Sequence, residues 1–558
     1  MSPTVLYLLA LGAMLLLSAP LFLLIGAATV LGYVLFGDVQ GFMDVTIIEN
    51  VRELTDKPPL LAIPFFVLSG SIMSHGAIAG RLVNVAKAVF SPLPGGLGIA
   101  TVAACMFFAA ISGSSPVTVI TIGGVMYPAM VAAGYHERFS TGLVTSAGTL
   151  GILIPPSIPM IVYAIFASGT DVIRVEDLFL AGLGPGVLIG LILGAYCMIM
   201  GIRKGERFTR PDLGAVWDAT VDGFWSLMLP VVILGGIYSG IFTATEAAAV
   251  SVVYALAVEL FVHRELTLKE VPAVVGEATI LMGSLLVIFA MAVGLNALLT
   301  DLGIPEAAAN WITSLDLTPT TFMLLLNGFL LLVGCLMDII SAIMILVPLL
   351  APMASLCGID PIHLGVVFIV NLELGYLTPP MGLNLFVSSS IFNKGLSEVI
   401  RSVVPFTGLL LIAVLIVTYV PTVSLGPVNA LNDKPVYVAF PDGKQCTAPA
   451  VDDGELGAED EDGSAEGDDG SKSISDLMED DDVKALLDDD GSDDSDDAAD
   501  DDGQPKSIQQ LMKDDDVQDL LNDEPAKAPK APVAAPSAPA QPKSIQEMMK
   551  DDDVQDLL

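Results

Sequence analysis

Two proline pairs, each in the middle of a membrane-length apolar stretch, constrain the fold of this chain most strongly. The segment 151–157 (GILIPPS) has a near twin 224 residues later at 375–381 (GYLTPPM). Because proline removes a backbone donor and clashes with the preceding turn, each stretch must be a helix broken near its centre. In lipid the freed carbonyls need partners, so broken helices persist where they line a cavity or bind an ion. Such breaks in two corresponding halves indicate a secondary transporter.

The composition places the chain among integral membrane proteins. Its mean hydropathy is +0.70 and 53% of its residues are hydrophobic, both well above the values of soluble domains. The formal net charge of −39 is concentrated at the end, because residues 451–558 hold 36 of the 63 acidic side chains. The preceding part predicts an all-α polytopic membrane protein of about ten spans and two re-entrant hairpins, at about 20 residues per crossing. The opening run 5–17 lacks a basic flank, so we expect no cleaved signal peptide.

The twin segments belong to a longer internal repeat. Gly134 matches Gly358 and Pro128 matches Pro352 at the same offset. We therefore predict two repeats with a linker between them, each repeat containing one re-entrant hairpin and one broken helix. The expected boundaries are 1–202 with hairpin 96–132, linker 203–215, and 216–425 with hairpin 318–354.

The basic residues predict the orientation of these repeats. The linker carries the densest basic cluster (Arg203, Lys204, Arg207, Arg210), whereas 301–317 contains no Lys or Arg. Since basic loops stay in the cytoplasm, the linker is expected there. Counting crossings then makes the repeats inverted and places both chain ends in the periplasm. The hairpins would enter from opposite faces and bring their tips to the broken helices near the midplane, as in alternating access.

Polar residues at the tips and breaks are the candidate substrate and ion ligands. Serine hydroxyls and unwound carbonyls supply the oxygens that a hard cation such as Na⁺ prefers, and polar side chains in mid-membrane are usually functional. Glu373 and Asp338 are the intramembrane acids near the second break and the second tip. The candidate ligands are Ser112, Gly113, Ser114, Ser115, Thr145, Gly151, Pro155, Pro156, Ser157, Asp338, Ser341, Asn371, Gly375, Thr378, Pro379, Pro380, Gly382 and Asn384.

Three of these assignments have structural alternatives. The serine-rich tip could instead be a small-residue helix interface. Asp338 could be a helix cap or a residue exposed at the membrane interface rather than a ligand. Asn384 suits either a carboxylate-bearing solute or a contact with a hairpin. Neither candidate site contains an Arg that would identify a carboxylate.

The remaining reactive side chains do not indicate an enzyme. Four cysteines lie in apolar context and are expected to be small core residues, whereas Cys446 stands alone in a polar segment as a possible free thiol. The four histidines lack metal-ligand spacing, and no nucleophile–base arrangement is present. We expect no organic cofactor and no nucleic-acid partner. The four apolar-context cysteines are Cys105, Cys197, Cys335 and Cys357.

The acidic end of the chain, 426–558, has a composition that predicts disorder. It contains one sequence motif three times, at 472–487, 506–521 and 543–558, and the first copy is KSISDLMEDDDVKALL. Each copy has apolar residues at helical spacing after a capping serine, so it would fold on a partner protein. The alternatives are a solubilising tail without a partner and weak cation binding by the aspartate runs.

The motifs GILIPPS and LTPPMGLNLFV, the SGSS hairpin and the ending TYVPTVSL together resemble the large membrane subunit of a tripartite ATP-independent periplasmic (TRAP) transporter. The resemblance covers residues 6–425. It implies an elevator-type protein of the bacterial inner membrane that imports an organic acid, such as a dicarboxylate, by Na⁺ symport. It also implies a periplasmic solute-binding protein and a small four-helix membrane subunit as partners.

Two other functions remain open on the sequence alone. A self-sufficient Na⁺-coupled anion symporter could have the same two-hairpin architecture, and the two are separated by whether uptake needs a soluble receptor. A membrane-anchored scaffold could act through the repeated tail, which extends more than a hundred residues beyond the end typical of the family. Broken helices argue against a mere anchor, because they are costly in lipid.

Overall fold

The computed structural model describes residues 3–17, 19–36, 58–167, 173–380, 382–441 and 446, and within these ranges the regular elements are helices. This confirms the predicted all-α class. Residues 1–455 form one compact unit, to which all the elements below belong. The three tail repeats lie outside the described residues.

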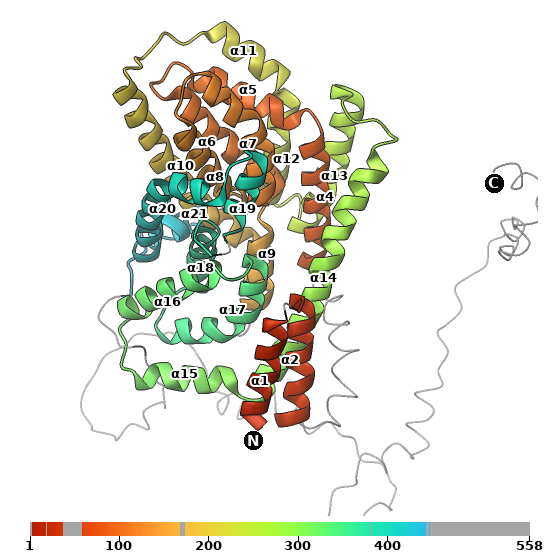
Figure 1. The fold of residues 1–558 in the computed structure, drawn as a ribbon, viewed down its shortest axis with the longest axis vertical. Coiled ribbons are helices and arrows are strands. Elements are labelled where there is room, and N and C mark those ends of the chain that lie inside the picture. Colours follow the sequence, from red (N-terminus) through yellow and green to blue (C-terminus); the bar gives the residue numbers. More distant parts are fainter. Residues whose placement is uncertain are drawn as a thin grey trace, which may run out of the picture. The chain divides into compact units, whose positions relative to one another are not determined.

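The described part of the first half contains eleven helical elements, and the last of them, α10, ends at Lys204, just inside the predicted linker (Figure 1). Its hairpin is α6–α7, and its broken helix is α8–η2 followed, after the Pro155–Pro156 break, by α9. The elements are α1 (Pro3–Leu16), α2 (Leu21–Phe36), η1 (Pro58–Leu61), α4 (Ala62–His75), α5 (Ile78–Phe90), α6 (Gly96–Ser112), α7 (Ser115–Ala132), α8 (Glu137–Ala147) with η2 (Gly148–Ile152), α9 (Ile158–Ala167) and α10 (Val175–Lys204).

The second half follows the same order of elements. Its hairpin is α16–α17, and its broken helix is α18 followed by α19. The inverted relation between the halves stays a prediction. The elements are α11 (Leu213–Asp222), α12 (Phe224–Tyr238), α13 (Ala244–Ala257) with the π-turn η3 (Val258–His263), α14 (Val271–Asp301), α15 (Ile304–Ser314), α16 (Pro319–Gly334), α17 (Ile339–Leu356), α18 (Pro361–Gly375), α19 (Leu383–Ile391), α20 (Leu396–Tyr419) and α21 (Thr422–Leu431).

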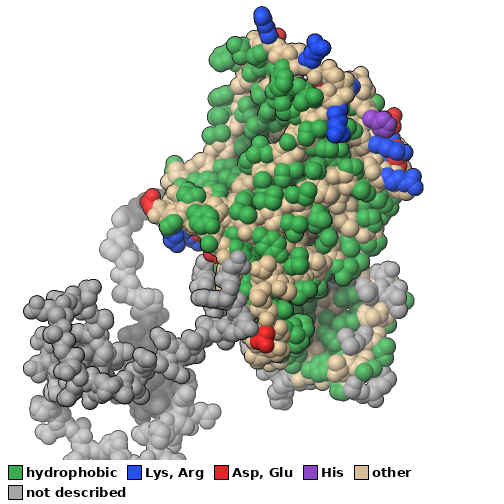
Figure 2. All heavy atoms as spheres, turned by 90° about the vertical axis from the view of Figure 1, so that its left-hand side faces the viewer, with side chains coloured by type: hydrophobic (Ala, Val, Ile, Leu, Met, Phe, Trp, Pro, Cys, Tyr) green, Lys and Arg blue, Asp and Glu red, His purple; other side chains and the backbone are tan. Residues whose placement is uncertain are grey.

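The described helices are those of a membrane protein. Seven of them are long and apolar enough to cross a bilayer, or eight if the bent pair α11–α12 forms one span. Figure 2 shows a broad hydrophobic surface, with most of the visible Lys and Arg gathered at one end. The two views share their vertical axis, so this is the end where α5 and α11 lie in Figure 1, opposite α15. On the visible face, most basic side chains therefore lie at one end, which is the pattern that a single cytoplasmic face predicts.

The two halves are interleaved at the centre of the unit. Helix α7 of the first hairpin packs against α19 of the second broken helix, and α17 of the second hairpin packs against α9 of the first. Helix α8 packs on α20 in the same crosswise manner. Each hairpin therefore meets the broken helix of the other half.

The segment after the last predicted span corrects two sequence predictions. Helix α21 continues to Leu431, past the predicted start of disorder at residue 426. Cys446, predicted as a possible free thiol, forms a disulfide with Cys357, predicted as an apolar core residue. The Cys446 backbone N–H also donates to the Leu317 carbonyl at 2.9 Å. The two cysteines are 89 residues apart, so the disulfide could not be predicted from their spacing in the sequence.

Candidate functional site

The first hairpin turns through Gly113, whose φ of 58° lies in the left-handed region that glycine tolerates. The hydroxyls of Ser112 and Thr118 are 3.0 Å apart, and Thr118 donates to the Ser114 carbonyl at 2.8 Å. Ser114 is extended and begins α7 as its N-cap. The tip is thus a turn in which hydroxyl and carbonyl oxygens gather within a few ångströms.

This tip lies directly against the first helix break. A Cβ on Gly113 would stand 2.9 Å from the Pro156 carbonyl oxygen, and one on Gly151 would stand 2.6 Å from the Ser114 carbonyl oxygen. The Ser157 hydroxyl crosses the break by donating to the Ile152 carbonyl at 2.5 Å. Both glycines are therefore needed for the close approach of backbone to backbone.

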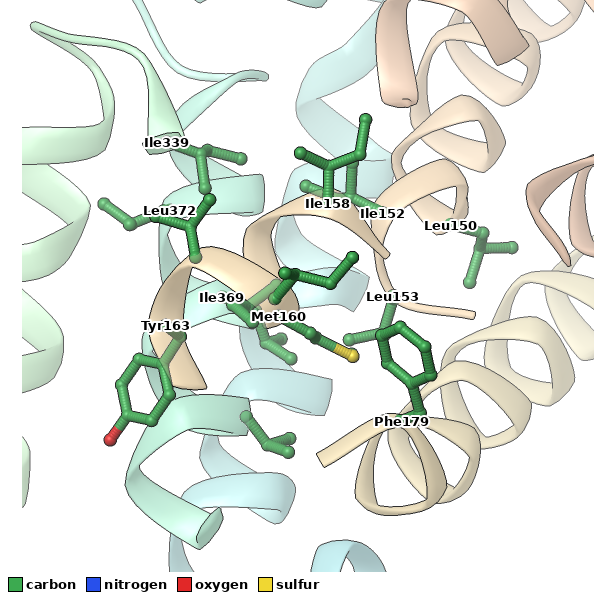
Figure 3. Close-up of a cluster of buried hydrophobic side chains, with 14 of the residues drawn as sticks. Leu150, Ile152, Leu153, Ile158, Met160, Tyr163, Phe179, Ile339, Ile369 and Leu372 are labelled. Atoms are coloured by element: carbon green, nitrogen blue, oxygen red, sulfur yellow. The ribbon is translucent and has the colours of Figure 1, made fainter. Parts of the chain in front are cut away.

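Apolar side chains surround the first break. Figure 3 shows Leu150, Ile152, Leu153 and Ile158 about it, with Phe179 of α10 beside Leu153. In the same view, the second half contributes side chains from α17 and α18. These are Ile339, Ile369 and Leu372. The break is held by packing, because all of Pro155, Pro156 and Ser157 are buried.

The second tip is built differently. Asp338 caps α17 by accepting hydrogen bonds from the Ser341 N–H at 3.0 Å and the Ser341 hydroxyl at 2.5 Å. Asp338 therefore acts as a helix cap, which was the alternative to its prediction as a ligand. The Ile339 N–H donates to the Tyr376 hydroxyl at 3.1 Å, which joins this tip to the second break. In that break Thr378 donates to the Leu374 carbonyl.

The second break is also the more open of the two. Its Pro379 and Pro380 are exposed, whereas Pro155 and Pro156 are buried. Gly375, just before the break, faces Gly334 of α16 so closely that a Cβ there would stand 2.4 Å from the Gly334 carbonyl carbon. The second hairpin and its broken helix are therefore also in backbone contact.

A cavity of about 510 Å³ lies between the two tips. Its walls come from α4, both hairpins, α9, α14, the second break and α19. None of the described residues that line it is a Lys or Arg, and one, Glu277, is acidic. Its polar lining residues are Ser71, Ser112, Ser114, Ser115, Glu277, Ser284 and Tyr376.

Two hydrogen bonds join the halves beside this cavity. Asn384 donates through its Nδ2 to the Ser115 hydroxyl at 2.6 Å, which is the hairpin contact proposed for it. Thr145 donates to the Ser388 hydroxyl at 2.7 Å. The Oδ1 atom of Asn384 is buried and has no hydrogen-bond partner among the described residues. An oxygen in this state can accept from a ligand or coordinate a cation.

A pair of salt bridges connects α8 to α19 and α20. Lys394 lies between α19 and α20, 2.6 Å from Glu137 at the start of α8 and 3.0 Å from Glu398. The hydrogen bond from Lys394 lowers the pKa of the Glu137 carboxyl. The pair thus links the beginning of the first broken helix to the end of the second.

The predicted site residues divide into three groups. Ser112, Gly113, Ser114 and Ser115 line the cavity. A second group lies behind the lining, at the breaks or the second tip. Asn371 lies elsewhere, since its Nδ2 donates to Asn327 at 2.7 Å and to Val367. The second group is Thr145, Gly151, Pro155, Pro156, Ser157, Asp338, Ser341, Gly375, Thr378, Pro379, Pro380, Gly382 and Asn384.

The sequence analysis missed several residues that face the cavity. Ser71 of α4 and Ser284 of α14 lie in largely apolar helices, and Tyr376 is part of the second twin motif. Glu277 was detectable, because it is an acid inside a predicted span. Together with the tip, these residues place hydroxyls and one carboxyl in a largely apolar cavity, and none of its described lining residues is a Lys or Arg.

Comparison with known proteins identifies relatives over the same region. The family described as "Tripartite ATP-independent periplasmic transporter, DctM component" matches residues 8–423. The C4-dicarboxylate TRAP transporter large permease protein DctM of Pseudomonas aeruginosa is 46% identical over 381 residues, which are 68% of this chain and 88% of the relative. The isethionate TRAP transporter permease protein DctMQ of Oleidesulfovibrio alaskensis is 40% identical over 376 residues, 66% of this chain and 58% of the relative.

Among solved structures, the YdaH transporter of Alcanivorax borkumensis has a similar fold. The TM-score is 0.56 at 14% sequence identity, and the match covers 78% of this chain and all of that one. At this identity the similarity concerns the fold alone.

Proposed function

This chain belongs to the DctM component family of tripartite ATP-independent periplasmic transporters, and we propose that, as the large permease subunit, it imports an organic acid by Na⁺ symport. The solute would be a carboxylate such as a C4-dicarboxylate, the substrate named for its Pseudomonas aeruginosa relative. It would be carried across the bacterial inner membrane without chemical change.

The charge of the central cavity is the observation that supports cation coupling. A carboxylate moved into low dielectric must be paired, because an isolated charge there costs several kcal/mol or more. The described lining offers hydroxyls, backbone oxygens and the Glu277 carboxylate, but no Lys or Arg. Cations that enter with the solute would supply the missing positive charge. Na⁺ suits the oxygen ligands of the first tip and the two breaks.

The partners in this proposal come from the family. A periplasmic binding protein would deliver the solute, and a small membrane subunit of four helices would hold the large subunit in the bilayer. Both chain ends would lie in the periplasm. Elevator-type movement would carry the hairpins and broken helices, which are packed crosswise into one body, across the membrane together.

The test is uptake of a radiolabelled C4-dicarboxylate into proteoliposomes that contain both membrane subunits. We expect uptake only with an inward Na⁺ gradient and added binding protein, and none when K⁺ replaces Na⁺. Uptake without the binding protein would support the self-sufficient symporter instead. An uptake rate that is the same with and without the Na⁺ gradient would refute Na⁺ symport.

A further inference from the structure

The carboxyl of Glu373 is buried in the core of the unit. The residue is 3% exposed, and neither of its carboxyl oxygens has a hydrogen-bond partner among the described residues. It stands on α18, two residues before Gly375 and the second break. It is absent from the lining of the central cavity, so it belongs to a different location from the hairpin-tip site.

A small void of about 10 Å³ adjoins this carboxyl. A void of this size holds about one water molecule, and a bare monovalent cation is no larger. Among the described residues, Glu373 is the one charged group that faces it. Its other lining residues come from η2, α10, α18 and α20, and they are Thr149, Ile189, Val370, Leu374, Leu410 and Val414.

Of the described residues that line the void, Thr149 is the other polar one. Its hydroxyl donates to the Ser146 carbonyl at 2.5 Å, so its oxygen lone pairs remain available. That oxygen can accept a hydrogen bond from the O–H of a neutral carboxylic acid or coordinate a cation bound to a carboxylate. Thr149 and Glu373 are also separated by the repeat offset of 224 residues. They therefore face each other where the two broken helices meet, since α18 contacts η2.

A second buried acid, Glu259, shows how a carboxylate with a structural role is stabilised in this fold. Glu259 is also fully buried. It accepts hydrogen bonds from the backbone N–H groups of Ala77 and Ile78, at 3.2 and 3.1 Å, at the beginning of α5. A helix N-terminus stabilises an anion in this way. Glu373 has no such donors, and an unpaired anion at its position would carry the full cost of desolvation.

We propose that Glu373 and Thr149 form a monovalent-cation site, which takes up one proton or one Na⁺ in each transport cycle and lies apart from the hairpin-tip sites. The bound cation cancels the charge of the carboxylate while the core is closed. The cation exchanges when the elevator-type movement opens the void. The proposal rests on cation-coupled uptake, and it adds one ion to those held at the tips.

The experiment measures coupling stoichiometry from reversal potentials in proteoliposomes, with a Na⁺ gradient and, separately, a pH gradient. Glu373→Gln keeps the shape of the side chain but cannot hold a cation. We expect this variant to move one cation fewer per solute than the unmodified protein. A change seen under the Na⁺ gradient identifies Na⁺, and one seen under the pH gradient identifies the proton. The matched control Glu259→Gln should keep the full stoichiometry.

Unchanged stoichiometry in Glu373→Gln would overturn the site. Thr149→Val is the second variant, because it removes the oxygen and retains the volume. It should weaken the dependence of the melting temperature in detergent on Na⁺ or pH, and a dependence identical to that of the unmodified protein would also overturn the site. If the unmodified protein shows no Na⁺-driven uptake, the proposed function fails, whereas the melting measurement still tests Glu373.

Discussion

A polar side chain in the middle of a membrane protein costs free energy unless it is paired, and the residues at the tips differ in how completely they are paired. Both carboxylate oxygens of Asp338 accept hydrogen bonds from Ser341, so Asp338 is already fully paired as a helix cap. Asn384 uses its donor on Ser115 but keeps a buried acceptor without a partner among the described residues. Of the two, Asn384 has the greater capacity to bind an ion or a solute.

Replacing Asn384 by alanine should therefore impair cation binding. The change removes the unpartnered oxygen and the hydrogen bond that joins α19 to the first tip. Loss of one such buried group costs about 1–3 kcal/mol, and each 1.4 kcal/mol is about a factor of ten. We expect the Na⁺ concentration for half-maximal uptake to rise about tenfold. It is measured from initial uptake rates against external Na⁺.

Asn327→Ala is the matched control. It also removes a buried amide, which bonds to Asn371 and Thr418 away from the cavity. This variant should melt at a lower temperature yet keep its Na⁺ dependence. An Asn384→Ala protein that folds and has the same Na⁺ dependence would remove Asn384 from the site.

At the scale of elements, backbone contact between helices holds the hairpins to the broken helices. Glycines allow this contact, since the absent Cβ lets two backbones touch. Gly151 lets η2 approach the first tip, and Gly375 lets α18 approach Gly334 of α16. The repeat offset relates Gly151 to Gly375, so both halves use the same residue type at the same junction.

Gly375→Ala should separate the second hairpin from its broken helix. The added Cβ would stand 2.4 Å from a backbone atom of Gly334, which cannot move aside as a side chain can. Overpacking of this kind costs about 1–3 kcal/mol, and we expect a lower melting temperature and less uptake. Gly328→Ala on α16 is the control, because no atom lies within 4 Å of its added Cβ. Equal melting temperatures for both variants would disprove the contact.

The elements were largely predictable from the sequence, whereas their contacts were only partly so. The repeat offset and the proline pairs predicted the hairpins and broken helices, because these patterns are local. The direction of each side chain is set by neighbours distant in sequence. Asn371 therefore turned out to face Asn327, and Tyr376 turned out to reach the second tip. Glu373 was noticed as an acid, but its lack of a partner could not be known without the packing around it.

At the scale of the whole molecule, the two ends of the transport unit differ in chemistry. Most of the Lys and Arg side chains visible in Figure 2 lie at the end where α5 and α11 lie in Figure 1. The Cys357–Cys446 disulfide adjoins Leu317, which lies between α15 and α16 and thus at the opposite end. Disulfides persist in oxidising compartments, and basic loops stay in the cytoplasm. Two independent rules therefore support the same orientation.

Removal of the tail should leave transport intact. Residues 1–455 form a compact unit by themselves, and this unit contains the cavity, both tips and the disulfide. A chain truncated after Glu455 is expected to keep its melting temperature and its Na⁺-driven uptake in proteoliposomes. Loss of uptake by a folded, truncated protein would give the tail a part in the transport mechanism. Loss of a copurifying protein, with uptake unchanged, would support the docking role of the repeats.

The orientation itself can be measured through the disulfide. In a protein whose Cys105, Cys197 and Cys335 are replaced by alanine, the remaining two cysteines are bonded to each other. A maleimide that cannot cross membranes should label spheroplasts only after an impermeant reductant has opened the bond. If the bond lies on the periplasmic face, labelling should occur in intact spheroplasts, because the reductant and the maleimide both reach the bond from outside.

The control places a cysteine at the basic end. Arg207→Cys, added to a background that also lacks Cys357 and Cys446, lies in the linker after α10. It should be labelled only after the membrane has been permeabilised. If Arg207→Cys reacts in intact spheroplasts while the reduced disulfide does not, the orientation is reversed, and the tail that follows Cys446 emerges in the cytoplasm. The expected pattern would instead place the tail beside the face from which the binding protein would deliver the solute.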